Sequence, residues 1–168
     1  MDAYQNTNGE PLIAPPEQLN FFHHAHAIVP QGMTAFQAYC RMTENSPRLL
    51  RLAFAIRDRL SRLGGVKPIS GFTGTHRLSP PEPGEQLDFF EVVHCYDSSL
   101  HLLAKDRHLS VLVAVTLQAA DGDCQRLSII TSVKTHNAFG RLYMLPVAPA
   151  HGVIVRSMLA KIGTSVVS

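Results

Sequence analysis

Two runs of alternating residues joined by a short polar turn place the strongest constraint on the fold of this chain. In residues 108–119 every second residue is aliphatic, and residues 126–136 repeat the pattern. Successive side chains of a strand point to opposite faces of a sheet, so each run predicts a strand with one apolar face. Gly122 in the turn between them suits the positive φ of a tight hairpin. The chain is therefore expected to contain an antiparallel sheet whose apolar face needs a cover.

The alternation also predicts which side chains face that cover. Those expected on the covered face are Val111, Val113, Val115 and Thr131. Those expected on the wetter face are Ser110, Thr116, Ser128 and Ser132. A register shift of one residue would exchange the two sets, so solvent accessibility tests this assignment directly.

A stripe of apolar residues near the end of the chain predicts the helix that covers the sheet. The stripe consists of His151, Ile154, Val155, Met158, Leu159 and Ile162, which recur at helical spacing. Pro149 suits the first helical turn, and Gly163 suits the C-terminal cap. The pattern predicts a turn and a short extended piece after the strands, followed by a helix over residues 149–162.

The remaining segments complete an α+β order. Residues 1–20 are predicted to form an N-terminal arm, and residues 21–168 a single domain that begins with a strand at 21–29. Thr34 can cap a first short helix, and Ser46–Pro47 starts a second one that ends at Gly64. Further strands are expected over 67–77, 88–96 and 100–106. The order of strand, two helices, antiparallel strands and terminal helix is typical of an α+β fold with one helix laid across a curved sheet.

Composition narrows the location and the partners. The net charge of +2 indicates no partner by itself, and the three cysteines lack the spacing of a disulfide framework or a zinc finger. The polar N-terminus does not resemble a secretory signal, and no apolar run approaches the roughly 20 residues of a membrane span. We expect a cytoplasmic protein without a membrane span or a nucleic-acid partner, because the basic face of the second predicted helix is more simply solvated. A homodimer stays open.

No motif assigns catalysis, a cofactor or a metal. His24 and His26 share one strand face, but zinc needs three or four ligands and no further ligand is close in sequence. Nucleophile, phosphate-binding and dinucleotide-binding motifs are absent from the sequence. We therefore expect no cofactor and no metal.

Several short motifs resemble a known family. Residues 46–67, Asp97–His101 and Asn137–Tyr143, followed by Pro146 and His151, are similar in order and spacing to domain-of-unknown-function family 2867, over roughly residues 21–163. The resemblance implies a place in the START-like, birch-pollen-allergen-like (SRPBCC) superfamily. It also implies the helix-grip fold, in which a curved antiparallel sheet wraps around a long C-terminal helix, with two short helices after the first strand. Members of that superfamily bind lipids, sterols or other apolar molecules, and some are enzymes.

A candidate site follows from this fold. An apolar small molecule, hydrophobic or amphipathic, is expected in a cavity between the sheet and the terminal helix. His94 is expected to face inward because it shares strand parity with Phe90 and Val92. His151 interrupts an apolar stripe, so its ring needs a partner, a water molecule or a ligand. The residues expected to bind the ligand are Phe90, His94, His101, Val111, Val113, Thr131, Tyr143, His151 and Met158.

Two other functions stay open at this point. The first is an enzyme of the same fold acting on a carbonyl-bearing apolar substrate, with His94, His101 or His151 as the acid–base group and Asp97 placed to orient His101. The second is a protein-interaction domain with a filled core. Convergent polar side chains inside an apolar enclosure would favour binding or catalysis over the filled core.

Overall fold

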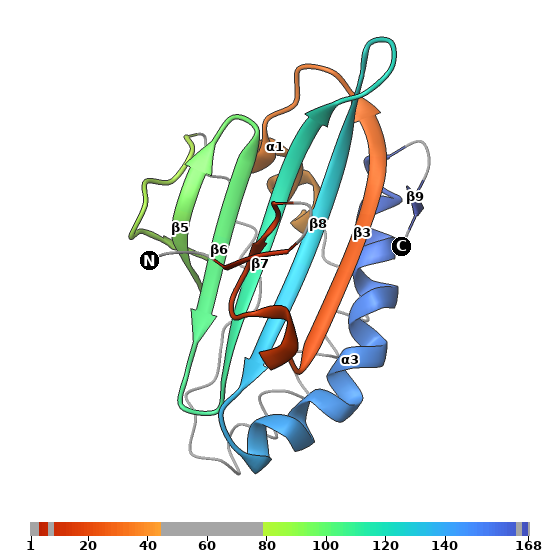
Figure 1. The fold of residues 1–168 in the computed structure, drawn as a ribbon. Coiled ribbons are helices and arrows are strands. Elements are labelled where there is room, and N and C mark those ends of the chain that lie inside the picture. Colours follow the sequence, from red (N-terminus) through yellow and green to blue (C-terminus); the bar gives the residue numbers. More distant parts are fainter. Residues whose placement is uncertain (1–3, 7–8, 45–78, 164–165, 168) are drawn as a thin grey trace.

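The computed structural model describes residues 4–6, 9–44, 79–163 and 166–167. Its main feature is a seven-stranded sheet in the order β4-β5-β6-β7-β8-β3-β9, in which every neighbouring pair is antiparallel (Figure 1). The strands are β3 (Phe21–Pro30), β4 (Gln86–Leu87), β5 (Phe90–Tyr96), β6 (Ser99–Lys105), β7 (Leu109–Ala119), β8 (Cys124–Thr135) and β9 (Val166–Val167). Two helices accompany it, α1 (Ala35–Thr43) and α3 (Ala138–Leu159). This α+β arrangement of an antiparallel sheet and a C-terminal helix confirms the fold class predicted from the sequence.

Strands β7 and β8 form the predicted hairpin at the centre of the sheet. Val115 pairs with Ile129, and Gly122 in the connecting turn has a φ of 69°. The first strand is also confirmed, since β3 lies beside β8 with Phe21 opposite Val133. The predicted strand over 67–77 and the second helix after Ser46 lie outside the described residues.

One face of the sheet carries the main core. Residues from β3, β7 and β8, such as Ala27, Val115 and Leu127, pack in a single cluster with Met158 and Leu159 of α3. Helix α1 adds Phe36 and Tyr39 to the same cluster. Thr34 caps α1 as predicted, because its hydroxyl accepts from the Gln37 N–H at 3.2 Å and the Gln37 side chain accepts from the Thr34 N–H at 3.1 Å. We call the face of the sheet that carries this core the helix-facing side.

The other face is covered by the N-terminal arm. The arm contains a two-stranded hairpin, β1 (Tyr4–Gln5) with β2 (Pro11–Leu12), followed by a short 3-10 helix, η1 (Pro16–Gln18). Leu12 packs on Ala114 and Ile130, and the Ile13 N–H donates to the Ser132 hydroxyl at 3.0 Å. Figure 1 shows this red segment crossing the near face of the sheet, with α1 behind it.

The arm explains which burial predictions fail. Val115 lies on the helix-facing side as predicted, and Val113 packs against the same core. The prediction that Ser110, Ser128 and Ser132 are wet is wrong, because they are 4 %, 5 % and 0 % exposed. Ser110, Leu112 and Ala114 are more buried than Val111 and Val113, so the predicted order of burial on β7 is wrong. The packing partners still place Val113 and Val115 on the helix-facing side and Ala114 under the arm.

Helix α3 begins eleven residues before the predicted start at Pro149. Asn137 caps it by accepting the Gly140 N–H at 3.0 Å, so Pro146 and Pro149 lie inside the helix. Each proline leaves a carbonyl four residues earlier without its helical donor. Those carbonyls belong to Leu142 and Leu145, whose side chains are exposed to solvent, so water can hydrate this side of the helix. Figure 1 shows that α3 changes direction along its length, as helices with internal prolines do.

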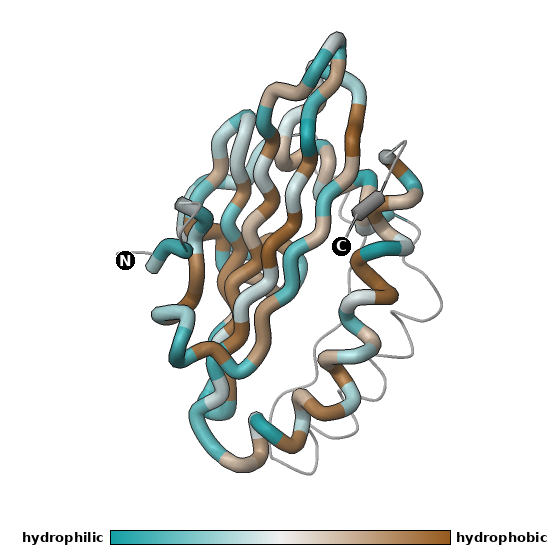
Figure 2. Tube along the Cα trace, turned by 45° about the vertical axis from the view of Figure 1, so that its right-hand side comes forward, coloured by the Kyte–Doolittle hydropathy of each residue, from teal (hydrophilic) through white to brown (hydrophobic). Residues whose placement is uncertain are grey.

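The stripe predicted for the terminal helix is confirmed. Ile154, Val155, Met158 and Leu159 are at most 9 % exposed, and Ile162 packs against the same core. By length and composition alone, α3 could also cross a membrane, which the sequence prediction of a shorter helix did not anticipate. Figure 2 shows hydrophobic segments recurring along its whole length. Gly163 follows the helix end, where its N–H donates to the Leu159 carbonyl at 2.9 Å.

Candidate functional site

Six buried side-chain polar atoms in the described part of the chain have no hydrogen-bond partner, and three of them lie near one another on the helix-facing side of the sheet. These three are His23 Nδ1, Thr131 Oγ1 and His151 Nε2. A buried polar atom without a partner costs free energy, and most such atoms in folded proteins are paired. Their presence in one region therefore marks a place where a ligand or a water molecule has groups to bind.

The sheet register and helix α3 bring these side chains together. His23 on β3 lies opposite Thr131 on β8, and Thr131 lies opposite Val113 on β7. The rings of His23 and His151 meet at nearly right angles, with centroids 5.2 Å apart. Phe21 contacts the His151 ring in the same way at 5.4 Å. We call Phe21, His23, Thr131 and His151 the histidine cluster.

Gly152 of α3 lies beside the His23 ring. A Cβ atom at Gly152 would lie 3.4 Å from His23 Nε2, at ordinary van der Waals distance. An alanine would therefore also fit at position 152 beside the His23 ring.

Both imidazoles of the cluster are neutral near neutral pH. Burial, reinforced by His23, lowers the pKa of His151 from 6.5 to about 4. Burial, together with the charge of Arg156 and the neighbouring His24, also lowers the pKa of His23. A neutral imidazole has one N–H donor and one acceptor nitrogen, so the cluster offers neutral hydrogen-bonding groups rather than positive charge.

The residues around the cluster are mostly apolar. Val111 and Val113 are half-buried on β7, and Val133 of β8 lies between Val111 and Phe21. Met158 is 9 % exposed within the main core. Few polar groups among apolar walls are typical of small-molecule sites.

Phe90 and Tyr143 lie away from the cluster. Phe90 is buried in the core on β5, several strands from β3. Tyr143 was expected beside His151 on an extended piece, but it lies inside α3, about 12 Å earlier along the helix axis. The earlier start of α3 is the reason that the two side chains separate.

His94 and His101 face the opposite side of the sheet, and the prediction that His94 points inward is wrong. A β-bulge between Val92 and His94 shifts the register, so His94 pairs with His101, which in turn pairs with Ala114 under the N-terminal arm. An extra residue in a strand reverses the parity of every residue that follows. His94 and His101 therefore lie across the sheet from His151.

These two histidines form a separate contact. Their rings stack with centroids 4.6 Å apart, and His94 Nε2 lies 2.8 Å from the Ser99 hydroxyl. Burial, with a smaller effect of His94, lowers the pKa of His101 from 6.5 to about 4. The ring of His101 thus meets His94 instead of Asp97, the partner considered for it from the sequence.

His23 and Phe21 were missed by the sequence reading, although a signal for them existed. The run at 22–26 drew attention to His24 and His26, which lie on the arm side with rings 6.0 Å apart. His23 has the opposite parity and shares its face with the buried Ala25.

Among the described residues, no three His, Cys, Asp or Glu side chains gather closely enough to hold a metal ion.

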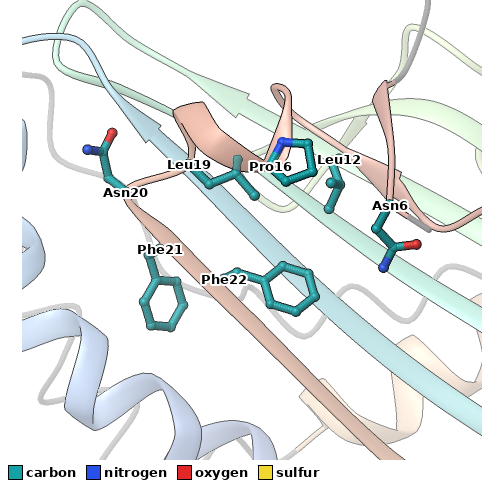
Figure 3. Close-up of a pocket in the computed structure, with 7 residues that line it drawn as sticks. All are labelled: Asn6, Leu12, Pro16, Leu19, Asn20, Phe21 and Phe22. Atoms are coloured by element: carbon teal, nitrogen blue, oxygen red, sulfur yellow. The ribbon is translucent and has the colours of Figure 1, made fainter. Parts of the chain in front are cut away.

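A hollow lies on the arm side of the sheet. It measures about 410 Å³, opens to solvent and is shown in Figure 3. Its lining residues are Asn6, Leu12, Pro16, Leu19, Asn20, Phe21 and Phe22. The Asn20 side chain already accepts the Thr135 N–H at 2.7 Å, and the Asn6 amide donates to Glu10 at 2.6 Å. This hollow is therefore a weaker candidate for polar recognition than the histidine cluster.

Comparison with known proteins adds a family match and two distant structural likenesses. The model of the family described as "Protein of unknown function (DUF2867)" matches residues 17–158. A conserved protein from Geobacillus kaustophilus is 7 % identical, with 83 % of this chain and 91 % of that chain covered and a TM-score of 0.39. A hypothetical protein from Helicobacter pylori is 16 % identical, with 90 % and 95 % covered and a TM-score of 0.42. The comparison with curated proteins gave no match.

Proposed function

This chain belongs to the DUF2867 family, and we propose that it binds a small, neutral, amphipathic molecule between β3, β8 and α3. The ligand carries a hydroxyl or carbonyl group on an otherwise apolar body. We further propose that the sheet and α3 form a helix-grip of the START-like kind. The antiparallel order of the strands and the packing of α3 on β3 and β8 support that architecture.

The unpartnered atoms of the histidine cluster carry this proposal. His23, Thr131 and His151 each bring a buried polar atom without a partner to the same side of the sheet. A ligand oxygen that bonds to one of the imidazoles would remove part of this cost. The half-buried Val111 and Val113 would contact the apolar part of the same molecule.

The lowered pKa values select a neutral polar group over a carboxylate. A carboxylate ligand would favour protonated imidazoles, whereas burial disfavours the charged form of both rings. A hydroxyl or carbonyl group needs only the donor and the acceptor that neutral histidine supplies.

The surroundings of His23 and His151 favour binding over acid–base catalysis. In the residues that the structure describes, neither ring is paired with a carboxylate that could orient it. A general base usually depends on such a partner to fix its tautomer and direction. The arrangement supports recognition better than proton transfer.

The experiment combines native mass spectrometry with a matched pair of variants. Protein purified from its own host is examined for retained ligand, and the released molecule is titrated against wild type, His151→Phe and His101→Phe. Phenylalanine keeps the bulk of the ring and removes its polar atoms. His101 is a close control, because it is also half-buried with a pKa lowered to about 4, but lies on the other side of the sheet.

The expected result is specific to one face. His151→Phe should weaken binding by about 1–3 kcal/mol, while His101→Phe leaves it unchanged. Equal losses in both variants would point to a general loss of stability instead. Unchanged affinity in His151→Phe with raised stability would contradict the proposal and identify His151 as a core histidine.

A further inference from the structure

The hollow between the N-terminal arm and the sheet has the size of a small-molecule pocket. We call it the arm-side hollow. Its volume is about 410 Å³, within the range of about 300–1,000 Å³ that is typical of such pockets. Figure 3 shows the Phe22 ring of β3 on one side of the hollow and Leu12, Pro16 and Leu19 of the arm on the other. A molecule bound there would therefore touch the arm and the sheet together.

Phe22 is the wall of the hollow that a ligand would cover. It is 45 % exposed, and it is the only phenylalanine among the large hydrophobic residues that are exposed in the described part of the chain. Leu12 and Leu19, in contrast, already pack with Ala114 and Ile130. Covering an aromatic ring removes a large apolar area from water, and a second ring gains further by stacking on it.

The other lining groups select a neutral molecule. The Asn20 side chain accepts the Thr135 N–H at 2.7 Å, and the Asn6 side chain exchanges two hydrogen bonds with Glu10, at 2.6 and 3.0 Å. Both asparagines therefore already make hydrogen bonds within the protein. None of the seven described residues that line the hollow carries a formal charge. A charged ligand would lose hydration there without meeting a counter-ion among them.

The extent of the hollow favours a small molecule over a protein partner. A stable protein interface has about 20–30 residues on each side, whereas seven described residues line the hollow. We propose that the arm-side hollow binds a flat, neutral aromatic molecule, with one face on the Phe22 ring and the other on Pro16 and Leu19. This site is distinct from the one proposed above, because neighbouring residues of a strand point to opposite faces and Phe22 therefore points away from the side of His23.

The test uses naphthalene as the probe, titrated into the full chain up to its solubility in water and followed by its fluorescence. Phe22→Leu keeps an apolar side chain and removes the ring, whereas Phe22→Tyr keeps the ring. Tyr96→Leu is the matched control, because Tyr96 is another exposed aromatic residue, 68 % exposed at the end of β5. His151→Phe separates the two sites, because Phe21 lines the hollow and its ring also contacts His151. Thermal melts check that each variant is folded.

Wild type, Phe22→Tyr, Tyr96→Leu and His151→Phe should bind naphthalene with similar affinity. Phe22→Leu should bind it about threefold to tenfold more weakly, because the stacking on the ring is lost. Hydrogen exchange of the wild type gives a second measurement that needs no variant. The Ile13 N–H follows the lining residue Leu12 and donates to the Ser132 hydroxyl at 3.0 Å, so a molecule that joins arm and sheet should slow its exchange.

Three results would overturn the proposal. They are a wild type that does not bind naphthalene, a Phe22→Leu variant that binds it as the wild type does, and an exchange rate at Ile13 that naphthalene leaves unchanged. Loss of binding in His151→Phe with full binding in Phe22→Leu would assign the aromatic molecule to the histidine cluster instead. A hollow that binds naphthalene as expected stands even if His151→Phe leaves the amphipathic ligand unaffected, so the two proposals fail separately.

Discussion

The neutral imidazole of His151 links the candidate site to the stability of the protein. Its pKa is lowered to about 4, mainly by burial, whereas an unfolded chain titrates near 6.5. Between about pH 4 and pH 6.5, the His151 ring is protonated in the unfolded state but neutral in the folded state. Stability is therefore fully present above about pH 6.5 and decreases as the pH falls toward 4.

We expect this titration to be measurable as a loss of about 2 kcal/mol between pH 7 and pH 5 for His151 alone. His101 should contribute a smaller loss, because its ring is only half-buried and solvent screens its charge more strongly than that of His151. Urea unfolding at the two pH values should show a smaller pH dependence for His151→Phe and a smaller one still when His101→Phe is added. An undiminished pH dependence in the double variant would show that other groups cause it.

Two glycines, Gly152 inside α3 and Gly163 after its end, should respond oppositely to alanine. A Cβ atom at Gly163 would lie 2.6 Å from the Ala27 Cβ and 3.2 Å from the Leu159 carbonyl oxygen, so Gly163→Ala should cost about 1–3 kcal/mol. At Gly152 the nearest atom would be His23 Nε2 at 3.4 Å, so Gly152→Ala should gain about 0.5–1 kcal/mol of helix propensity. Thermal unfolding of both variants checks the pair, and equal losses would mean that α3 approaches β3 closely at both positions.

What the sequence predicts at this scale depends on periodicity. His151 was placed on the inner side of the helix because the stripe includes it, and the structure agrees. His94 was misplaced because one bulged residue reverses strand parity, and nothing in the surrounding residues signals a bulge. Gly163 was assigned to a helix cap, whereas its observed constraint is the close passage of β3.

At the scale of the element, α3 has two apolar sides with different consequences. Met158 is 9 % exposed in the main core, so Met158→Ala should destabilise the fold by about 2–5 kcal/mol. Leu145 on the solvent-exposed side of α3 is 69 % exposed, so Leu145→Ala should change stability by no more than about 0.5 kcal/mol. Denaturant melts compare the two. A large loss at Leu145 would mean that this side of α3 is covered within the protein.

The start of α3 was not predictable from propensity alone. Two prolines argue against a continuous helix because an interior proline costs about 3 kcal/mol. The observed helix nevertheless begins at the Asn137 cap, where Gly140 fits closely against the His108 backbone carbonyl. Packing of the later turns on the sheet can offset the proline cost, and that term appears only once the elements are assembled.

At the scale of the whole molecule, the sheet is covered on both sides. Leu12 of the arm is 2 % exposed on Ala114 and Ile130, so Leu12→Ala should lose about 2–5 kcal/mol of stability. The pH dependence from His151 should remain, because that residue lies on the other side of the sheet. Urea unfolding at pH 7 and pH 5 measures both quantities. A stability equal to that of wild type would show that the arm does not contribute to the folded state.

The position of β3 between β8 and β9 has a consequence for how the protein is made. Phe21 on β3 cannot pair with Val133 on β8 until most of the chain has been synthesised, because β3 and β8 lie far apart in the sequence. Contacts between such distant segments slow folding, since a long loop must close before they form. Until then, β3 has no neighbouring strand, so Ala25, Ala27 and Val29, which are buried in the folded protein, lack their packing partners. The sheet can therefore close around β3 only after β8 and β9 have been synthesised.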